Sequence, residues 1–153
     1  MFLLGGRKQT RSTTKGATMN SLVCDLELSK QLCKANIIKD AEFKYWKEHT
    51  YQKVYMDNRA HDMFDTFVCY APTAEEVLRV LPKKITIKDV DHYFECGFNR
   101  NGEFLLHYTC VNTEILHMMR NSDLFPRIGH QPKLSNACAK MALCLKAEGL
   151  INP

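Results

Sequence analysis

The heptapeptide FNRNGEF, residues 98–104, is the feature that most constrains how this chain folds. Asn99 is suited to start a type I turn, and Gly102 is suited to the positive φ that follows in a three-residue hairpin connection. Strand-forming residues flank the turn on both sides. The sequence therefore predicts an antiparallel β-hairpin over about residues 90–111.

The register of this hairpin follows from the turn. It pairs Asn99 with Glu103 and places Cys96 opposite Leu106. The other pairs are Phe98–Phe104, Gly97–Leu105, Glu95–His107, Phe94–Tyr108, Tyr93–Thr109 and His92–Cys110. A two-residue turn would slip one strand and mix aromatic with polar residues on both faces. Because register follows the burial of one face, the first pairing is favoured.

Two histidines and two cysteines in this hairpin raise the question of a metal site. In the favoured register Cys96, Cys110 and His92 share the apolar face, whereas His107 lies on the opposite face beside Glu95. Zinc needs four converging ligands, or three and a water. We therefore expect no metal ion here, and a surface cross-strand pair between Glu95 and His107.

The seven cysteines are an odd number, and none of them forms a C-x-x-C pair. Secretion would leave one thiol unpaired, and zinc ribbons and redox motifs need the C-x-x-C spacing. We expect free cysteines that are buried as small apolar residues. No cofactor is expected. The cysteines are Cys24, Cys33, Cys69, Cys96, Cys110, Cys138 and Cys144.

Three helices are predicted from apolar periodicity, over about residues 25–35, 73–81 and 134–148. The middle helix has the clearest start, because Thr73 and Glu76 have the spacing of a capping box. The first helix has Asp25 as its expected N-cap and Asn36 as its left-handed end, and the last has Gly149 as its expected C′ residue.

The remaining segments predict a small antiparallel sheet on which these helices pack, so the expected fold class is α+β. Residues 41–48 and 66–70 have the composition of strands, and 47–63 reads as a long loop or an irregular hairpin. Residues 112–119 predict a short helix, and 122–132 a loop with Phe125 and Ile128 as apolar anchors. Residues 20–153 are expected to form one domain.

The positive charge of the chain is concentrated at its start. Residues 1–19 hold Arg7, Lys8, Arg11 and Lys15 and no acid, which leaves 17 basic and 17 acidic residues in 20–153. We expect this basic leader to be disordered. Two interpretations stay open: an arm that binds nucleic acid or another acidic partner, or a solvated tail or extension upstream of an initiator at Met19.

Three segments carry a resemblance to a known family: LVCDLELSKQLCKANIIKDAEFKYW, APTAEEVLRVLPKKI and LSNACAKMALCLKAEGLI. They resemble a family of small phage and prophage proteins of gut bacteria, over most of residues 21–151. The resemblance implies a compact α+β domain, and it brings no activity and no catalytic residues. The sequence departs from the family pattern at 47–63 and 112–132, and a function particular to this chain is expected in those segments.

These observations leave three candidate functions: protein binding, nucleic-acid binding and catalysis. We expect a protein-interaction module with a host or phage protein as partner, for which the candidate anchors are Trp46, Tyr51, Tyr55 and Phe125. The alternative is a nucleic-acid-binding protein that uses the basic leader with Lys83 and Lys84. A small enzyme is the second alternative, although no local motif for one is present.

Membrane insertion and secretion are not expected from the sequence. No apolar run approaches the roughly 18 residues that a membrane span needs. The opening MFLLGG is too short for a signal-peptide core, and its charges follow the apolar stretch instead of preceding it. The predicted location is the cytoplasm, which is that of the host cell if a phage encodes the protein.

Overall fold

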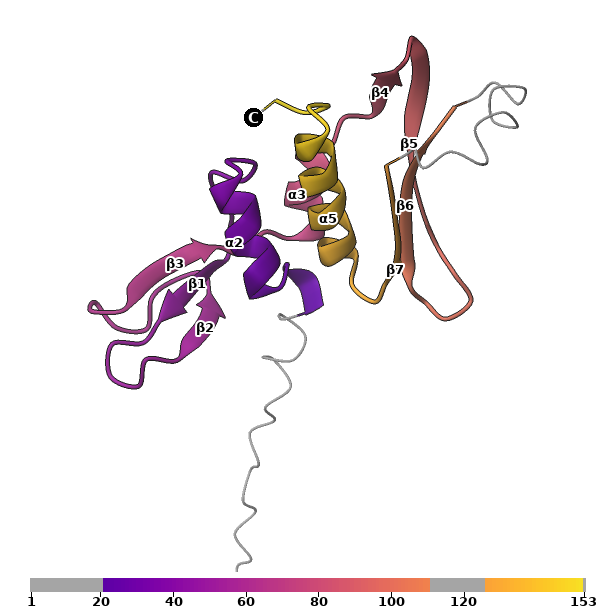
Figure 1. The fold of residues 1–153 in the computed structure, drawn as a ribbon. Coiled ribbons are helices and arrows are strands. Elements are labelled where there is room, and N and C mark those ends of the chain that lie inside the picture. Colours follow the sequence, from indigo (N-terminus) through magenta and orange to yellow (C-terminus); the bar gives the residue numbers. More distant parts are fainter. Residues whose placement is uncertain (1–20, 111–125, 153) are drawn as a thin grey trace, which may run out of the picture.

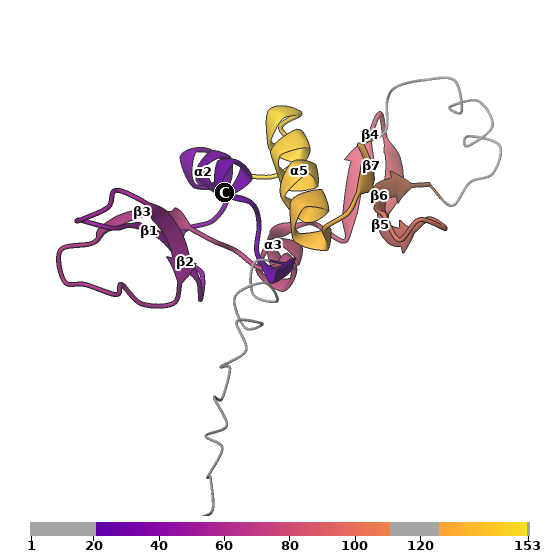
Figure 2. The same ribbon diagram turned by 90° about the horizontal axis from the view of Figure 1, so that it is seen from below.

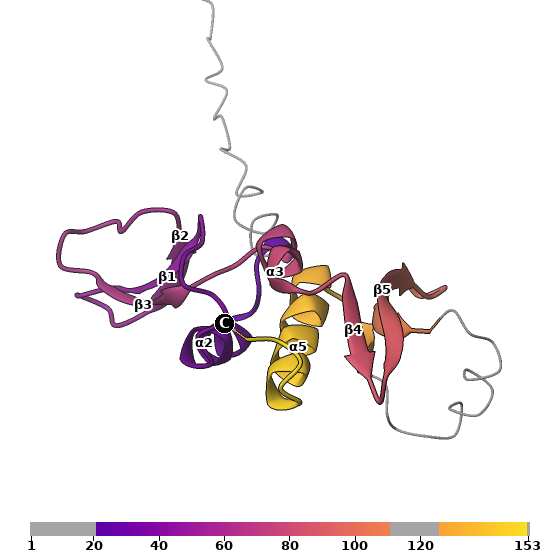
Figure 3. The ribbon, with the colours of Figure 1, turned by 90° about the horizontal axis from the view of Figure 1, so that it is seen from above.

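The computed structural model describes residues 21–110 and 126–152 and has the predicted α+β fold, with three helices and two antiparallel sheets in that part of the chain. The helices lie between the two sheets (Figures 1, 2 and 3). They are α2 (Leu26–Lys34), α3 (Ala74–Val80) and α5 (Leu134–Ala147), each within two residues of its predicted bounds. The strands are β1 (Lys44–Lys47), β2 (Val54–Asp57), β3 (Thr66–Tyr70), β4 (Lys84–Ile87), β5 (Val90–Phe98), β6 (Phe104–Thr109) and β7 (Arg127–Gln131).

The central hairpin, β5 with β6, confirms both the predicted turn and the predicted register. The Asn99 N–H donates to the Glu103 carbonyl at 2.9 Å, and Gly102 has a φ of 76°. Strand pairing runs from Phe98–Phe104 outward to Tyr93–Thr109 without a slip. The expected Glu95–His107 pair is present on the outer face, at 3.1 Å between carboxylate and imidazole.

The arrangement of the strands differs from the prediction in one detail: the described residues form two antiparallel sheets where the sequence indicated one. The hairpin is the middle of a four-stranded sheet of order β4-β5-β6-β7. Strand β7 lies inside the segment 122–132 that was predicted as a loop. Its local sequence is flanked by prolines and includes His130 at a φ of 55°, so pairing with β6 specifies this strand more than its own composition does.

The second sheet has the order β2-β1-β3 and contains the predicted strands at 41–48 and 66–70. The segment 47–63 is a hairpin, as one of its two interpretations held. The Glu48 N–H donates to the Lys53 carbonyl at 2.8 Å, and Gln52 at a φ of 56° closes the turn. This hairpin turns β2 back onto β1 at the outer edge of the sheet.

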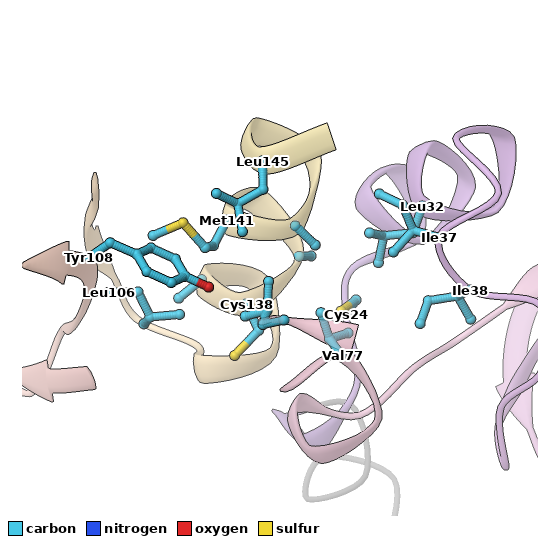
Figure 4. Packing of buried hydrophobic residues seen from close by; sticks show 14 of the residues in the cluster. Cys24, Leu32, Ile37, Ile38, Val77, Leu106, Tyr108, Cys138, Met141 and Leu145 are labelled. Atoms are coloured by element: carbon cyan, nitrogen blue, oxygen red, sulfur yellow. The ribbon is translucent and has the colours of Figure 1, made fainter. Parts of the chain in front are cut away.

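The hydrophobic core lies where the helices meet each other and the four-stranded sheet (Figure 4). Leu106 and Tyr108 project from β6 towards Met141 and Leu145 of α5, and all four are essentially inaccessible to solvent. The buried Tyr108 hydroxyl donates to the Pro82 carbonyl at 2.6 Å, and burial raises its pKa to about 12. Leu32, from α2, packs into the same cluster, so one core joins the helices to this sheet.

The helix ends confirm three predicted caps and correct a fourth. Thr73 and Glu76 form the complete capping box at the start of α3. Asn36 and Gly149 adopt the left-handed conformation after α2 and α5, with φ values of 58° and 69°. The Asp25 side chain, in contrast, makes no cap hydrogen bond to α2. Its carboxylate instead accepts hydrogen bonds from Lys133 and Asn136 at the start of α5.

The cysteines are free thiols, and most of them are removed from solvent as predicted. Burial raises the pKa of Cys24 and of Cys138 to about 12, so both stay protonated at neutral pH. Cys96 is the exception, because it lies in the exposed last part of β5, from Glu95 to Phe98. His92 and Cys110 are both buried on the predicted apolar side of the hairpin.

The turn between β4 and β5 stores strain that a substitution can release. Ile87 pairs with Val90, and the two residues between them, Lys88 and Asp89, have φ values of 49° and 65°. This is the pattern of a type I′ turn, which favours Asn-Gly. We expect the double substitution K88N/D89G to raise the free energy of unfolding by about 1 kcal/mol, measured by chemical denaturation.

A substitution of opposite sign controls for this prediction. Gly102 has a φ of 76° and open space around its missing side chain, so G102A introduces backbone strain without a clash. It is expected to lower the free energy of unfolding by about 1 kcal/mol. If both variants changed the free energy of unfolding in the same direction, the two turn assignments would be contradicted.

Candidate protein-binding interface

The two faces of the three-stranded sheet have different neighbours. One face is turned towards α2 and the body: the Tyr45 hydroxyl donates to the Cys24 carbonyl at 2.8 Å, and Cys69 is buried. Side chains alternate between the faces of a strand, so Trp46 points away from the body. Its register partners Tyr55 on β2 and Phe67 on β3 lie on the same outward side.

These outward rings, with His61 of the loop after β2, make up what we call the aromatic face: Trp46, Tyr55, His61, Phe67 and Tyr70. Tyr70 also packs against the hydrophobic core. The His61 ring stacks on Tyr55 with 4.1 Å between centroids. Trp46 meets Phe67 edge to face at 5.8 Å, and Phe67 meets Tyr70 at 5.1 Å. Phe67, on the edge strand β3, remains 45% exposed. None of the described helices covers this side of the sheet (Figures 1 and 3).

The loop that connects β2 to β3, residues 58–65, is held in place by the Asp65 carboxylate. This carboxylate accepts hydrogen bonds from the Tyr55 hydroxyl at 2.6 Å, the His49 N–H at 3.0 Å and the Asp62 N–H at 3.1 Å. The Tyr55 hydroxyl in turn accepts the His61 N–H at 2.7 Å. The loop is therefore fixed to the aromatic face by side-chain hydrogen bonds instead of by an apolar core.

A second carboxylate, Asp57, holds the His61 ring against Tyr55. One ring nitrogen of His61 lies 2.9 Å from the Asp57 carboxylate. The hydrogen bond from His61 holds the pKa of Asp57 below its ordinary range, and the hydrogen bond from Tyr55 does the same for the pKa of Asp65. Both carboxylates are therefore ionised at neutral pH and engaged by groups of the protein.

The ordered loops display apolar side chains beside the aromatic face. Met63 is 88% exposed, and its neighbour Phe64 is exposed while its ring lies 5.7 Å from that of His49. Tyr51, at the tip of the β1–β2 turn, is 75% exposed. An exposed apolar side chain adds little stability to the folded chain. Because the loop that carries it is already ordered, the loop backbone loses little conformational entropy on binding.

The structure places the sequence-predicted partner residues as follows. Trp46 and Tyr55 are neighbours on the aromatic face, and Tyr51 lies at the end of the same hairpin. Phe125 lies outside the described residues. The sequence did not indicate Phe67, which is the most exposed aromatic ring of the strands in this sheet.

The candidate nucleic-acid residues are not brought together with this face. Lys83 and Lys84 lie at the four-stranded sheet, on the other side of the helices (Figure 1). Lys84 is paired with Asp91 at 2.9 Å, and Asp91 also accepts from the Thr86 hydroxyl at 2.8 Å. The predicted cations of the leader, Arg7, Lys8, Arg11 and Lys15, lie outside the described residues.

A groove lies beside α3, and its polar groups serve the fold. It has a volume of about 610 Å³ and is lined by the segment 36–42, by the exposed side of α3 and by Ile151 and Asn152. Glu76, in its wall, accepts the Glu42 N–H at 2.8 Å and also caps α3. Within the described residues, no group of three His, Cys, Asp or Glu side chains is arranged to hold a metal ion.

Removing the Tyr55 hydroxyl tests whether the hydrogen-bond network orders the loop. In Tyr55→Phe, Asp65 loses its shortest donor and the His61 N–H loses its acceptor. We expect faster hydrogen exchange at the amides of His61, Asp62 and His49, with unchanged exchange at Glu103 of the distant hairpin as an internal control. Unchanged exchange at all four amides would contradict this role.

We expect the loop 58–65 to lose its fixed conformation at acidic pH. The folded-state pKa of Asp65 lies below its ordinary value of 3.8. The stabilisation that the ionised Asp65 carboxylate gives to the loop is therefore complete above pH 3.8 and is lost as the pH falls through the lowered pKa. We expect the amide signals of His49 and Asp62 to broaden or shift in that range in nuclear magnetic resonance spectra. In Asp65→Asn these amides should already be perturbed at neutral pH.

No helix in residues 21–110 and 126–152 combines the length and the hydrophobicity that crossing a bilayer requires. Comparison of the chain with protein-family models, with curated proteins and with solved structures found no match in any of the three.

Proposed function

We propose that this protein is a non-catalytic protein-interaction module that binds its partner through the aromatic face of the three-stranded sheet. The observation that carries the proposal is the group of aromatic rings on a side of the sheet that no described helix covers. Trp46, Phe67 and Tyr70 contact one another in sequence, and the stacked pair of Tyr55 and His61 lies on the neighbouring strand and loop. Tyr and Trp are the residues most enriched among those that dominate the energetics of protein interfaces.

The construction of the face supports binding over a purely structural role. A ring that serves stability is expected to be buried, but Phe67 and the adjoining Met63 and Phe64 are left exposed. The Asp65 hydrogen bonds hold the loop in one conformation before any partner arrives. Ordering that is already present in the free protein reduces the entropy lost on association.

The three segments that resemble phage and prophage proteins favour an accessory role of that kind. In this proposal the chain is a small phage-type protein that occupies a surface of a host or phage protein in the host cytoplasm. The β1–β2 turn and β2 belong to the segment 47–63, where the sequence departs from that family's pattern. A binding preference particular to this chain is expected in that segment.

The test compares proteins captured from a host lysate by three forms of the full chain. They are the wild type, Phe67→Thr on the aromatic face, and Phe98→Thr at the tip of the central hairpin. Phe98 is the matched control because it is the same residue type, lies at a strand end and is 76% exposed. We expect a protein captured by the wild type and by Phe98→Thr and lost with Phe67→Thr.

Two results would refute the proposal. Capture of the same proteins by all three forms would show that the aromatic face does not bind them. Capture that disappears after nuclease treatment, or that requires the basic leader, would favour the nucleic-acid alternative.

A further inference from the structure

We propose that Cys33 and Cys69 form a reversible oxidation site, at which a low-molecular-weight disulfide of the glutathione type converts the two thiols into a bond that joins α2 to β3. The observation that carries this inference is the meeting of two free thiols from different elements of the fold. The inference goes beyond the proposed function, because it concerns the side of the three-stranded sheet that faces the body.

The fold brings the two cysteines together where α2 packs against the end of β3 (Figures 1 and 3). Cys69 is 3% exposed and lies opposite Tyr45, on the side of the sheet that is turned towards α2. Cys33 lies one helical turn after the buried Ser29, so it belongs to the side of α2 that packs on the protein. The Cys33 thiol lies within hydrogen-bonding reach of the Cys69 thiol.

The two thiols differ in their access to solvent. Cys33 is half-buried, so a small disulfide can reach it, whereas Cys69 is enclosed. Burial is the largest cause that raises the pKa of Cys69 to about 11, and the neighbouring Cys33 adds to the rise. Cys33 is therefore the thiol that meets the oxidant, and Cys69 is the thiol that completes the reaction.

The charged groups that face Cys69 largely offset each other. Lys30 of α2 lowers the pKa of Cys69 and Glu27 raises it, and these two side chains form an ion pair at 2.8 Å. On β1 the neighbouring group is the Tyr45 hydroxyl, which is neutral because burial raises its pKa to about 12. Burial thus decides the state of the Cys69 thiol, which is protonated at neutral pH.

The reaction consists of two thiol–disulfide exchanges in sequence. In the first, the Cys33 thiolate attacks one sulfur of oxidised glutathione, the bond between the two glutathione sulfurs breaks, and one glutathione leaves as a thiolate. In the second, the Cys69 thiolate attacks the Cys33 sulfur, the protein disulfide forms, and the other glutathione leaves. Two protein thiols are oxidised and one small disulfide is reduced, and the leaving thiolates take up the two protons that the protein releases.

The disulfide encloses residues 34–68, which contain β1, β2 and most of β3. A cross-link restricts the unfolded chain over this loop and so favours the folded state. We expect the oxidised chain to unfold at a temperature roughly 5–15 °C above that of the reduced chain. Oxidation therefore fixes the sheet that carries the aromatic face to α2, and reduction releases it.

The test treats the full chain, without denaturant, with oxidised glutathione at mildly alkaline pH. The remaining thiols are then blocked, and the digested chain is mapped by mass spectrometry. We expect a pair of peptides linked through Cys33 and Cys69, which an excess of reduced glutathione separates again. Cys33→Ser should abolish the linked pair, whereas Cys144→Ser, at another half-buried cysteine on α5, should leave it intact.

Three results would overturn the inference. They are a glutathione adduct on Cys33 with no link to Cys69, a link between other cysteines in place of this one, and a link that forms only after denaturant has unfolded the chain. The map of the wild-type chain distinguishes these outcomes, so the test does not depend on the folding of a variant. Failure to find the linked pair leaves the capture experiment on Phe67 unaffected, and the two proposals are therefore tested separately.

Discussion

We expect Met141→Ala to lower the free energy of unfolding by about 2–5 kcal/mol, the range found for large-to-small substitutions in protein cores. Met141 is 0% exposed and lies on α5 against Leu106 and Tyr108 of β6 (Figure 4). Truncation removes apolar contacts from both the helix and the sheet and leaves a cavity. Chemical denaturation followed by circular dichroism measures the loss.

Met63 supplies the matched control, since it is the same residue type at 88% exposure on the loop beside the aromatic face. Met63→Ala should change the free energy of unfolding by less than about 0.5 kcal/mol. Comparable losses for the two variants would mean that the Met63 loop is packed in solution. That outcome would contradict the exposed surface on which the proposed function depends.

The second large effect is expected from Asn136→Ala, which breaks a reciprocal contact between the starts of α2 and α5. The Asn136 side-chain oxygen accepts the Asp25 N–H at 2.9 Å, and its amide donates to the Asp25 carboxylate. Asn136 is only 8% exposed, so its removal leaves the Asp25 N–H without its acceptor. A loss of about 1–3 kcal/mol is expected from denaturation measurements.

A double-mutant cycle of Asp25→Ala with Asn136→Ala isolates the side-chain part of this contact, the hydrogen bond from the Asn136 amide to the Asp25 carboxylate. Burial alone would raise the pKa of Asp25, but hydrogen bonds from Lys133 and Asn136 outweigh it and hold that pKa below its ordinary value of 3.8. The coupling should therefore be present at neutral pH and should weaken as the pH falls through the lowered pKa. Additive effects at neutral pH would show that the two residues do not act together.

Much of the fold could be predicted because its strongest signals are local. The turn at Asn99–Gly102 determines the register of β5 and β6, and the Thr73–Glu76 box determines where α3 begins. Both depend on residues within a few positions of each other. The left-handed residues Asn36 and Gly149 mark helix ends for the same reason.

The parts that could not be predicted depend on distant residues. Strand β7 forms because β6 offers it a partner. Asp25 is the N-cap residue of α2, but its side chain does not cap the helix because Asn136 and Lys133, over a hundred residues away, bind its carboxylate. Neither contact leaves a pattern in the nearby sequence. The division of the strands between two sheets likewise depends on how the helices pack between them.

The candidate site was only partly predictable for a related reason. Trp46, Tyr51 and Tyr55 could be identified as aromatic residues in a polar segment. Phe67 could not, because regular alternation places it on the same face as the buried Cys69. In the structure β1 pairs Tyr45 with Cys69 but Trp46 with Phe67, so a bulge at Val68 turns Phe67 outward to join the aromatic face.

Site-specific photo-crosslinking tests the central claim most directly, because it reports which surface a partner touches. A photoreactive phenylalanine analogue replaces Phe67 in one form of the full chain and Phe98 in another. The account predicts that, after irradiation in host lysate, a discrete protein is crosslinked from position 67 and not from position 98. A crosslink from position 98 alone, or none from position 67, would contradict it.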